Sequence, residues 1–138
     1  MQPFDFGTQE MRMLWASALL GLVQLLLAAL FSVGARGLPW AVGPRDEAGK
    51  AMGKMGGRLD RAYRNFLETF ALFASMVLLA SALGRHSSAT VWGAQLYFYG
   101  RVVYVPVYAF GVPFVRTFAW TVAILGVVLV MLGIWPGI

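Results

Sequence analysis

The chain contains no cysteine and a single histidine, and only 12% of its 138 residues are charged. The absence of cysteine excludes disulfides, a thiolate metal site and a cysteine nucleophile. One histidine cannot build a zinc site with conventional ligands unaided, so we expect no metal cofactor. Any thiol chemistry must therefore arrive with a substrate.

Apolar sequence, by contrast, is abundant: 59% of the residues are hydrophobic and the mean hydropathy is +0.70. A soluble domain is nearer half apolar and a quarter charged. Apolar runs at 13–33, 66–83, 91–110 and 114–134 have about the length that a helix needs to cross a bilayer. The sequence therefore predicts an all-α chain, one integral membrane domain over 1–138 built as an up-down-up-down four-helix bundle. Its helices are expected at about 12–34, 59–83, 91–110 and 114–134.

The positive charges predict how the chain is oriented. The connection at 35–57 carries four arginines and lysines, whereas the connection at 84–90 carries one arginine. The positive-inside rule places the first of these loops in the cytoplasm and both termini outside. Trp15, Trp92 and Trp135 then fall at the outer helix ends, as in an aromatic belt. The net charge of +5 lies on membrane flanks without any groove-reading motif, so we expect membrane lipids and no nucleic acid as partners.

Two sets of polar side chains recur at helical spacing in otherwise apolar helices, and each set shares one helix face. The sets are Arg61, Asn65 and Glu68 on the second helix, and Tyr97, Arg101, Tyr104 and Tyr108 on the third. Because the helices are antiparallel, a rise of about 1.5 Å per residue brings Glu68 and Arg101 to similar depth. We expect these two side chains to form a structural ion pair, since an unpaired charge at that depth is costly.

An ion pair that only joins two helices explains this cluster incompletely. The remaining polar side chains supply more hydrogen-bond donors than one carboxylate accepts, and Arg36 and Arg116 add guanidinium groups at the same membrane face. Such an excess indicates an absent anion, a carboxylate or a phosphate. Pro106 should kink the third helix and open a pocket there. Arg58 and Arg64, nearby, are expected to be solvated or attracted to anionic headgroups.

Small residues recur seven apart on the last two helices, as Gly93 with Gly100 and Gly126 with Gly133. Small residues on one stripe let helices approach closely in lipid. Packing within the chain is the favoured interpretation of these glycines, and a subunit interface is the alternative.

Three stretches of the sequence resemble the MAPEG family, the membrane-associated proteins in eicosanoid and glutathione metabolism, in their bacterial-type members. The stretches are "ARG" at 35–37, "RAYRNFLETFALF" at 61–73 and "RVVYVPVYAFGVPFVR" at 101–116. The resemblance implies a homotrimer in an inner membrane, with glutathione as co-substrate between neighbouring subunits near the cytoplasmic face. The glutathione-binding residues that it implies are Arg36, supplied by the adjacent subunit, with Arg61, Asn65, Glu68, Tyr104 and Tyr108.

The resemblance further implies a glutathione transferase or peroxidase in which Arg116 is catalytic and stabilises the thiolate. That thiolate would attack a lipophilic small-molecule substrate, an electrophile or a hydroperoxide, and Tyr104 or Tyr108 is an alternative donor to it. A non-catalytic protein that binds a thiol or lipid is one alternative. A small four-helix transporter with Glu68 as a proton-coupled site is another, and the expected pairing of Glu68 with Arg101 argues against it.

Overall fold

The computed structural model describes residues 7–137, and these form helices and connections without any strand. Four helices are long, and one short helix lies in the first connection. They are α1 (Gln9–Arg36), α2 (Leu38–Val42), α3 (Gly53–Ala82), α4 (Ser88–Ala109) and α5 (Pro113–Ile134). The prediction of an all-α chain is confirmed. The short helix α2 was not predicted, and α1, α3 and α4 begin several residues earlier than expected.

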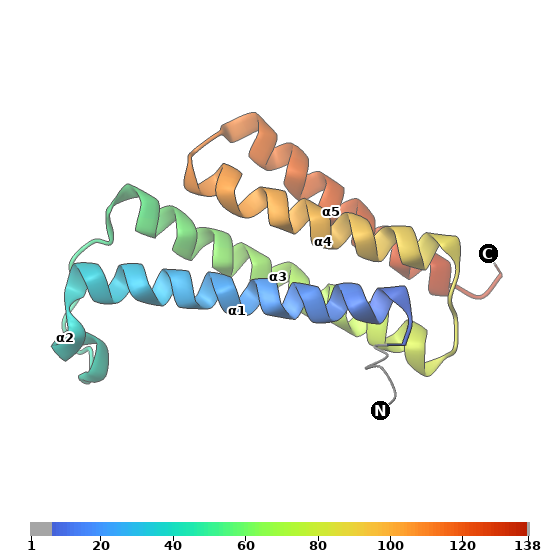
Figure 1. Cartoon of the computed structure of the whole chain (residues 1–138), viewed down its shortest axis with the longest axis horizontal. Coiled ribbons are helices and arrows are strands. Elements are labelled where there is room, and N and C mark those ends of the chain that lie inside the picture. The colour runs from blue at the N-terminus through green and yellow to red at the C-terminus, as the bar shows by residue number, and fades with distance from the viewer. Residues whose placement is uncertain (1–6, 138) are drawn as a thin grey trace, which may run out of the picture.

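The four long helices alternate in direction and lie side by side (Figure 1). The closest pairings are α4 with α5 and α1 with α3, and α4 also contacts both α1 and α3. The turn between α4 and α5, residues 110–112, lies toward the same end of the molecule as α2 (Figure 1). We call this end the turn end. The connection between α3 and α4 lies at the opposite end.

The unexpected helix α2 is held by its tryptophan. Gly37, with a φ of 85°, ends α1, and Pro39 starts the next helix, as proline often does in a first turn. The guanidinium carbons of Arg36 and Arg45 lie 4.6 and 5.1 Å from the ring centroid of Trp40. A helix of this length is not stable by itself, so it depends on these cation–π contacts. Sequence periodicity did not predict it because five residues are too few to show a helical pattern.

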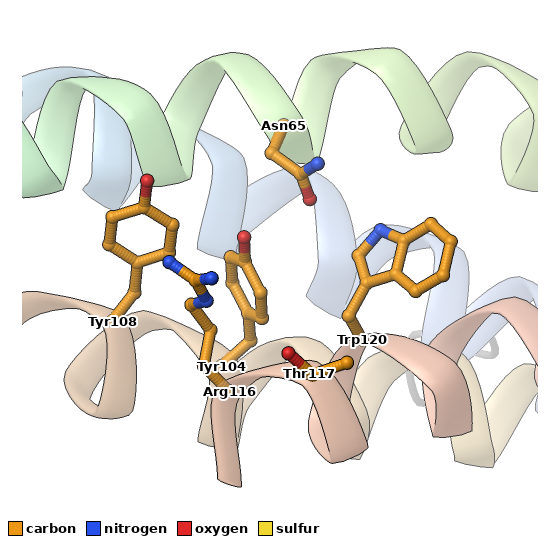
Figure 2. A pocket seen from close by; sticks show the side chains of 6 residues that line it. All are labelled: Asn65, Tyr104, Tyr108, Arg116, Thr117 and Trp120. Carbon is orange, nitrogen blue, oxygen red and sulfur yellow. The ribbon is translucent and has the colours of Figure 1, made fainter. Parts of the chain in front are cut away.

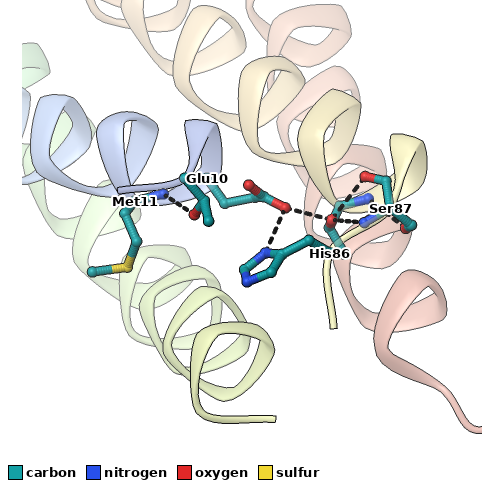
Figure 3. Close-up of polar contacts among 6 residues, drawn as sticks. Glu10, Met11, His86 and Ser87 are labelled. Atoms are coloured by element: carbon teal, nitrogen blue, oxygen red, sulfur yellow. Dashed lines mark hydrogen bonds and ion pairs between the residues drawn. The ribbon is translucent and has the colours of Figure 1, made fainter. Parts of the chain in front are cut away.

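A polar cluster at the opposite end joins the start of α1 to the start of α4. The carboxylate of Glu10 is buried, accepts a hydrogen bond from the Thr90 hydroxyl and lies 3.2 Å from Nδ1 of His86 (Figure 3). Thr90 also forms a capping box with Ser87, which satisfies the first backbone N–H groups of α4. These contacts fix the end of the bundle that is farther from the turn end.

Glycines set the distance between α4 and α5. A Cβ atom added to Gly93 would lie 2.6 Å from the carbonyl oxygen of Gly126, and one added to Gly126 would lie 2.5 Å from the carbonyl oxygen of Gly93. A Cβ atom added to Gly133 would lie 2.7 Å from the Thr90 side chain, and one added to Gly100 would lie 3.1 Å from the carbonyl oxygen of Ala119. The glycine stripes thus pack the chain against itself, which was the favoured interpretation of the sequence.

Replacing Gly93 with alanine is expected to lower the free energy of unfolding by about 1–3 kcal/mol, because the new methyl group meets backbone that cannot move aside. Gly34→Ala is the matched control, since a Cβ atom there meets nothing within 4 Å. Unfolding of the purified protein by sodium dodecyl sulfate measures both variants. Equal stability of the two would contradict the close α4–α5 packing.

The outer faces of the helices are suited to lipid. Three helices, α1, α3 and α5, are long and apolar enough to cross a membrane. The fourth predicted span, α4, does not reach that composition, because Arg101 and several tyrosines lie within it. Large apolar side chains such as Leu26 and Leu30 are 54% and 67% exposed. The chain is therefore a multi-pass integral membrane protein, in which α4 is apolar except for Arg101 and its tyrosines and the first turns of α3 carry most of the charge.

Candidate functional site

A cavity of about 300 Å³ opens between α3 and the α4–α5 pair, toward the turn end. Side chains from all three helices point into it (Figure 2). We call it the inner cavity; its lining residues are Asn65, Tyr104, Tyr108, Arg116, Thr117 and Trp120. Five of the six carry a hydroxyl, an amide or a guanidinium group that can donate a hydrogen bond to an anion. Its volume is at the lower end of the range for small-molecule sites.

Behind this cavity lies Arg101, whose side chain is fully buried. Its Nη1 donates to Oδ1 of Asn65 over 2.7 Å, and its Nη2 donates to Oγ1 of Thr69 over 2.5 Å. The guanidinium carbon lies 5.0 Å from the ring centroid of Tyr104, a cation–π distance. Arg101 therefore fixes two residues that line the inner cavity, Asn65 by a hydrogen bond and Tyr104 by its ring.

The predicted ion pair between Glu68 and Arg101 is wrong for this chain. No ion pair within residues 7–137 joins the two, and Glu68 is exposed. The reason is the direction of the side chains around α3. Asn65 and Thr69 are four residues apart and accept the hydrogen bonds of Arg101, whereas Glu68 lies at the exposed edge of this face, where its charge acts on Arg101 only from beyond ion-pair distance. Similar depth was necessary for the pair but did not suffice.

Tyr108 lies between two guanidinium groups. Nε of Arg61 donates a hydrogen bond to the Tyr108 hydroxyl over 3.2 Å. The guanidinium carbon of Arg116 lies 4.9 Å from the centroid of the same ring (Figure 2). The Tyr104 and Tyr108 ring centroids are 5.5 Å apart. Sequence reasoning thus predicted correctly that these residues converge, while what they bind stays a prediction.

A second cavity of about 300 Å³ adjoins the inner cavity and shares Tyr108 and Arg116 with it. It lies beside the α4–α5 turn, and we call it the turn cavity. The residues that line it are Arg58, Arg61, Tyr108, Gly111, Val112, Pro113 and Arg116. The two cavities together form a polar region that is bounded by three arginines and two tyrosines.

Arg36 does not reach either cavity within one chain. Its guanidinium donates to the carbonyl oxygen of Lys50 over 2.9 Å and to Oγ of Ser32 over 3.2 Å, beside Trp40. It lines a separate polar cavity of about 400 Å³ near α2. The resemblance assigned Arg36 to the site of an adjacent subunit, and its distance from both cavities within the chain agrees with that assignment without testing it.

Sequence reasoning gave no role to three residues that the structure brings to this region: Thr69, Thr117 and Trp120. Thr69 lies one helical turn beyond Asn65, and Trp120 lies one turn beyond Arg116. This spacing of four residues was the available signal, since it places each on the face of a residue that had been selected. Both threonines lie among apolar residues, and a single hydroxyl there is a weak signal of a polar site.

Fold and cavities together define a class: a small multi-pass membrane protein with an anion-attracting polar region near one end of its helices. A family model described as the MAPEG family matches residues 13–135, nearly the whole chain. The chain belongs to the MAPEG family, membrane proteins of eicosanoid and glutathione metabolism, and the resemblance read from the sequence is confirmed. A search of curated proteins found no match to this chain.

Proposed function

We propose that the chain is a glutathione-dependent transferase or peroxidase that acts on lipophilic substrates in the membrane. The observation that carries the proposal is the pair of adjoining cavities in which Arg61 and Arg116 lie on either side of Tyr108. Guanidinium groups that converge on one cavity favour a ligand with negative charge. Membership of the MAPEG family, proteins of eicosanoid and glutathione metabolism, supports glutathione as that ligand.

Glutathione has two carboxylates and one ammonium group, and the site offers groups for all three. Arg61 and the amide of Asn65 can hold one carboxylate. Glu68, which is exposed and forms no ion pair within residues 7–137, is available for the ammonium. In a homotrimer, Arg36 of the adjacent subunit would hold the second carboxylate. In this arrangement Glu68 binds the ammonium group of glutathione, which it could not do if it were paired with Arg101.

Arg116 is the catalytic residue in this proposal. A cation beside a thiol favours the thiolate, which is the reactive nucleophile. Arg116 is half-buried and extends between Tyr104 and Tyr108 at the wall of the inner cavity (Figure 2). The hydroxyl of either tyrosine can donate a hydrogen bond to the same sulfur atom.

The second substrate reaches the thiolate from the bilayer. Trp120 lines the inner cavity and is 37% exposed, and the neighbouring Phe118 is 69% exposed on the outer face of α5. A lipophilic molecule can therefore pass from lipid to the inner cavity along apolar side chains. Attack on an electrophilic carbon forms the thioether and expels the leaving group, such as a halide. Attack on the outer oxygen of a hydroperoxide breaks the O–O bond, so that the alcohol leaves with a proton and the sulfur becomes a sulfenic acid. A second glutathione then reduces this sulfenic acid to the disulfide and water.

Activity of the purified protein tests the proposal. We expect glutathione-dependent turnover of a sparingly soluble aryl halide or hydroperoxide, and at least a tenfold loss of turnover in Arg61→Gln. Arg64→Gln is the matched control, because Arg64 lies on the same helix but is paired with Asp60 at 3.0 Å. Binding of glutathione without turnover of either substrate would leave the non-catalytic alternative.

The transporter alternative depends on Glu68. Glu68 and Arg101 form no ion pair among the described residues, so the argument raised against transport from the sequence is reduced to the longer-range attraction between these two charges. Family membership now provides the main argument for thiol chemistry over transport. Turnover that persists in Glu68→Gln with a higher KM for glutathione would support the binding role given above.

A further inference from the structure

Arg58 has no part in the proposed thiol chemistry, yet it is built into the wall of the turn cavity. Its Nη1 donates to the carbonyl oxygen of Ala109 over 3.3 Å. Gly111, with a φ of 74°, lies so close that a Cβ atom there would be 2.8 Å from the guanidinium carbon. The α4–α5 turn therefore holds this guanidinium in place against the cavity, rather than leaving it in solvent as the sequence suggested.

The turn cavity concentrates positive charge. Arg58, Arg61 and Arg116 all line it, and its lining residues include no aspartate or glutamate. The protein acceptors that these guanidinium groups have here are neutral: a carbonyl oxygen for Arg58 and a hydroxyl for Arg61. The nearest acid in sequence, Asp60, is paired with Arg64 instead. Three cations around one cavity repel one another unless an anion lies between them.

We propose that the turn cavity is a phosphate-binding site. Three guanidinium forks offer more donors and more charge than one carboxylate with two oxygens accepts, whereas a phosphate group offers three or four oxygens and up to two negative charges. Helix α5 starts at Pro113 on the wall of this cavity, so its positive dipole end adds to the same attraction. Arg58 is the residue that distinguishes this site from the thiol site.

The phosphate can belong to a membrane lipid or to a free phosphate compound. Phe110 and Phe114, on the two sides of the turn, are 71% and 88% exposed. Apolar side chains beside a cationic cavity, near the end of membrane helices, match a headgroup phosphate with its acyl chains alongside. A free phosphate compound uses the same guanidinium groups without these phenylalanines.

The test measures thermal stability of the detergent-purified full chain against inorganic phosphate and, in a second arm, short-chain phosphatidic acid. Glutathione is left out, since Arg61 and Arg116, which the thiol proposal uses, also line the turn cavity. We expect saturable stabilisation of the wild type and at least a tenfold higher half-saturating concentration in Arg58→Gln. Arg64→Gln, with the same charge change on the same helix, should behave like the wild type. Tighter binding of phosphatidic acid than of phosphate identifies the headgroup as the source, and the reverse identifies a free compound.

Equal responses of Arg58→Gln and Arg64→Gln, or no stabilisation of the wild type in either arm, would overturn the proposal. If Arg58→Gln does not fold, Arg58→Lys keeps the charge but loses the fork, and a half-saturating concentration equal to that of the wild type would overturn it as well. Thiolate formation by glutathione is recorded on the same preparations without phosphate. Arg58→Gln should retain it, so a failure of the thiol proposal and a failure of the phosphate site give different results.

Discussion

Arg116→Ala is expected to remove the ultraviolet thiolate band of bound glutathione at neutral pH. The half-buried guanidinium group lies at the wall of the inner cavity, with its carbon 4.9 Å from the Tyr108 ring centroid. Each unit of thiol pKa that it lowers corresponds to about 1.4 kcal/mol in favour of the thiolate. Loss of even one such unit reduces the thiolate fraction up to about tenfold near neutral pH. A difference spectrum with saturating glutathione measures the effect.

Arg116→Lys separates charge from shape in this experiment. A lysine keeps the positive charge but not the planar fork, so we expect it to retain part of the band. Arg64→Ala removes one exposed arginine elsewhere and should leave the band intact. An Arg116→Ala protein that still ionises bound glutathione would transfer the role to Tyr104 or Tyr108, which Tyr→Phe variants then distinguish.

Thr69→Val is expected to destabilise the folded chain by about 2–4 kcal/mol, although it hardly changes the side-chain volume. Oγ1 of Thr69 accepts a hydrogen bond from Arg101 and lies 3.1 Å from the Tyr97 hydroxyl oxygen. Both partners are fully buried. Valine removes that oxygen, so the buried guanidinium nitrogen of Arg101 and the buried hydroxyl of Tyr97 each lose a hydrogen-bond partner. Leaving a buried polar group without a partner costs more free energy than the hydrogen bond itself contributed to stability. Unfolding by sodium dodecyl sulfate measures the loss.

Thr69→Ser keeps the hydroxyl and is the control. It removes one methyl group, so we expect a cost of about 1 kcal/mol. If the valine and serine variants unfold at the same detergent concentration, the hydroxyl does not hold Arg101 in place. The contact geometry behind the inner cavity would then need another explanation.

The long helices could be predicted from the sequence because an apolar run of membrane length leaves a helix as the main solution in lipid. Two features of the fold could not be predicted this way. The first turns of α3, from Gly53 to Arg58, are polar, so hydropathy placed its start too late. Helix α2 depends on Arg36 and Arg45 contacting the Trp40 ring, and those contacts appear only when the connection folds.

The candidate site was predicted in its membership better than in its pairings. Helical spacing correctly placed Arg61 with Asn65, because residues three or four apart share a face. Depth along the antiparallel helices then led to the wrong partner for Arg101. Depth in the membrane gives only the position along the helix axis. The direction in which each side chain points around that axis determines that Arg101 bonds to Asn65 and Thr69 and not to Glu68. Local spacing carries no information on how a neighbouring helix is rotated.

The most direct test of the thiol site is a difference ultraviolet spectrum of the purified wild-type protein with glutathione, compared with the analogue in which serine replaces its cysteine. We expect a thiolate band that saturates with glutathione and is absent with the serine analogue, while calorimetry shows that both bind. Saturated glutathione binding with no thiolate band at neutral pH would contradict the account of these arginines as a site that ionises a bound thiol.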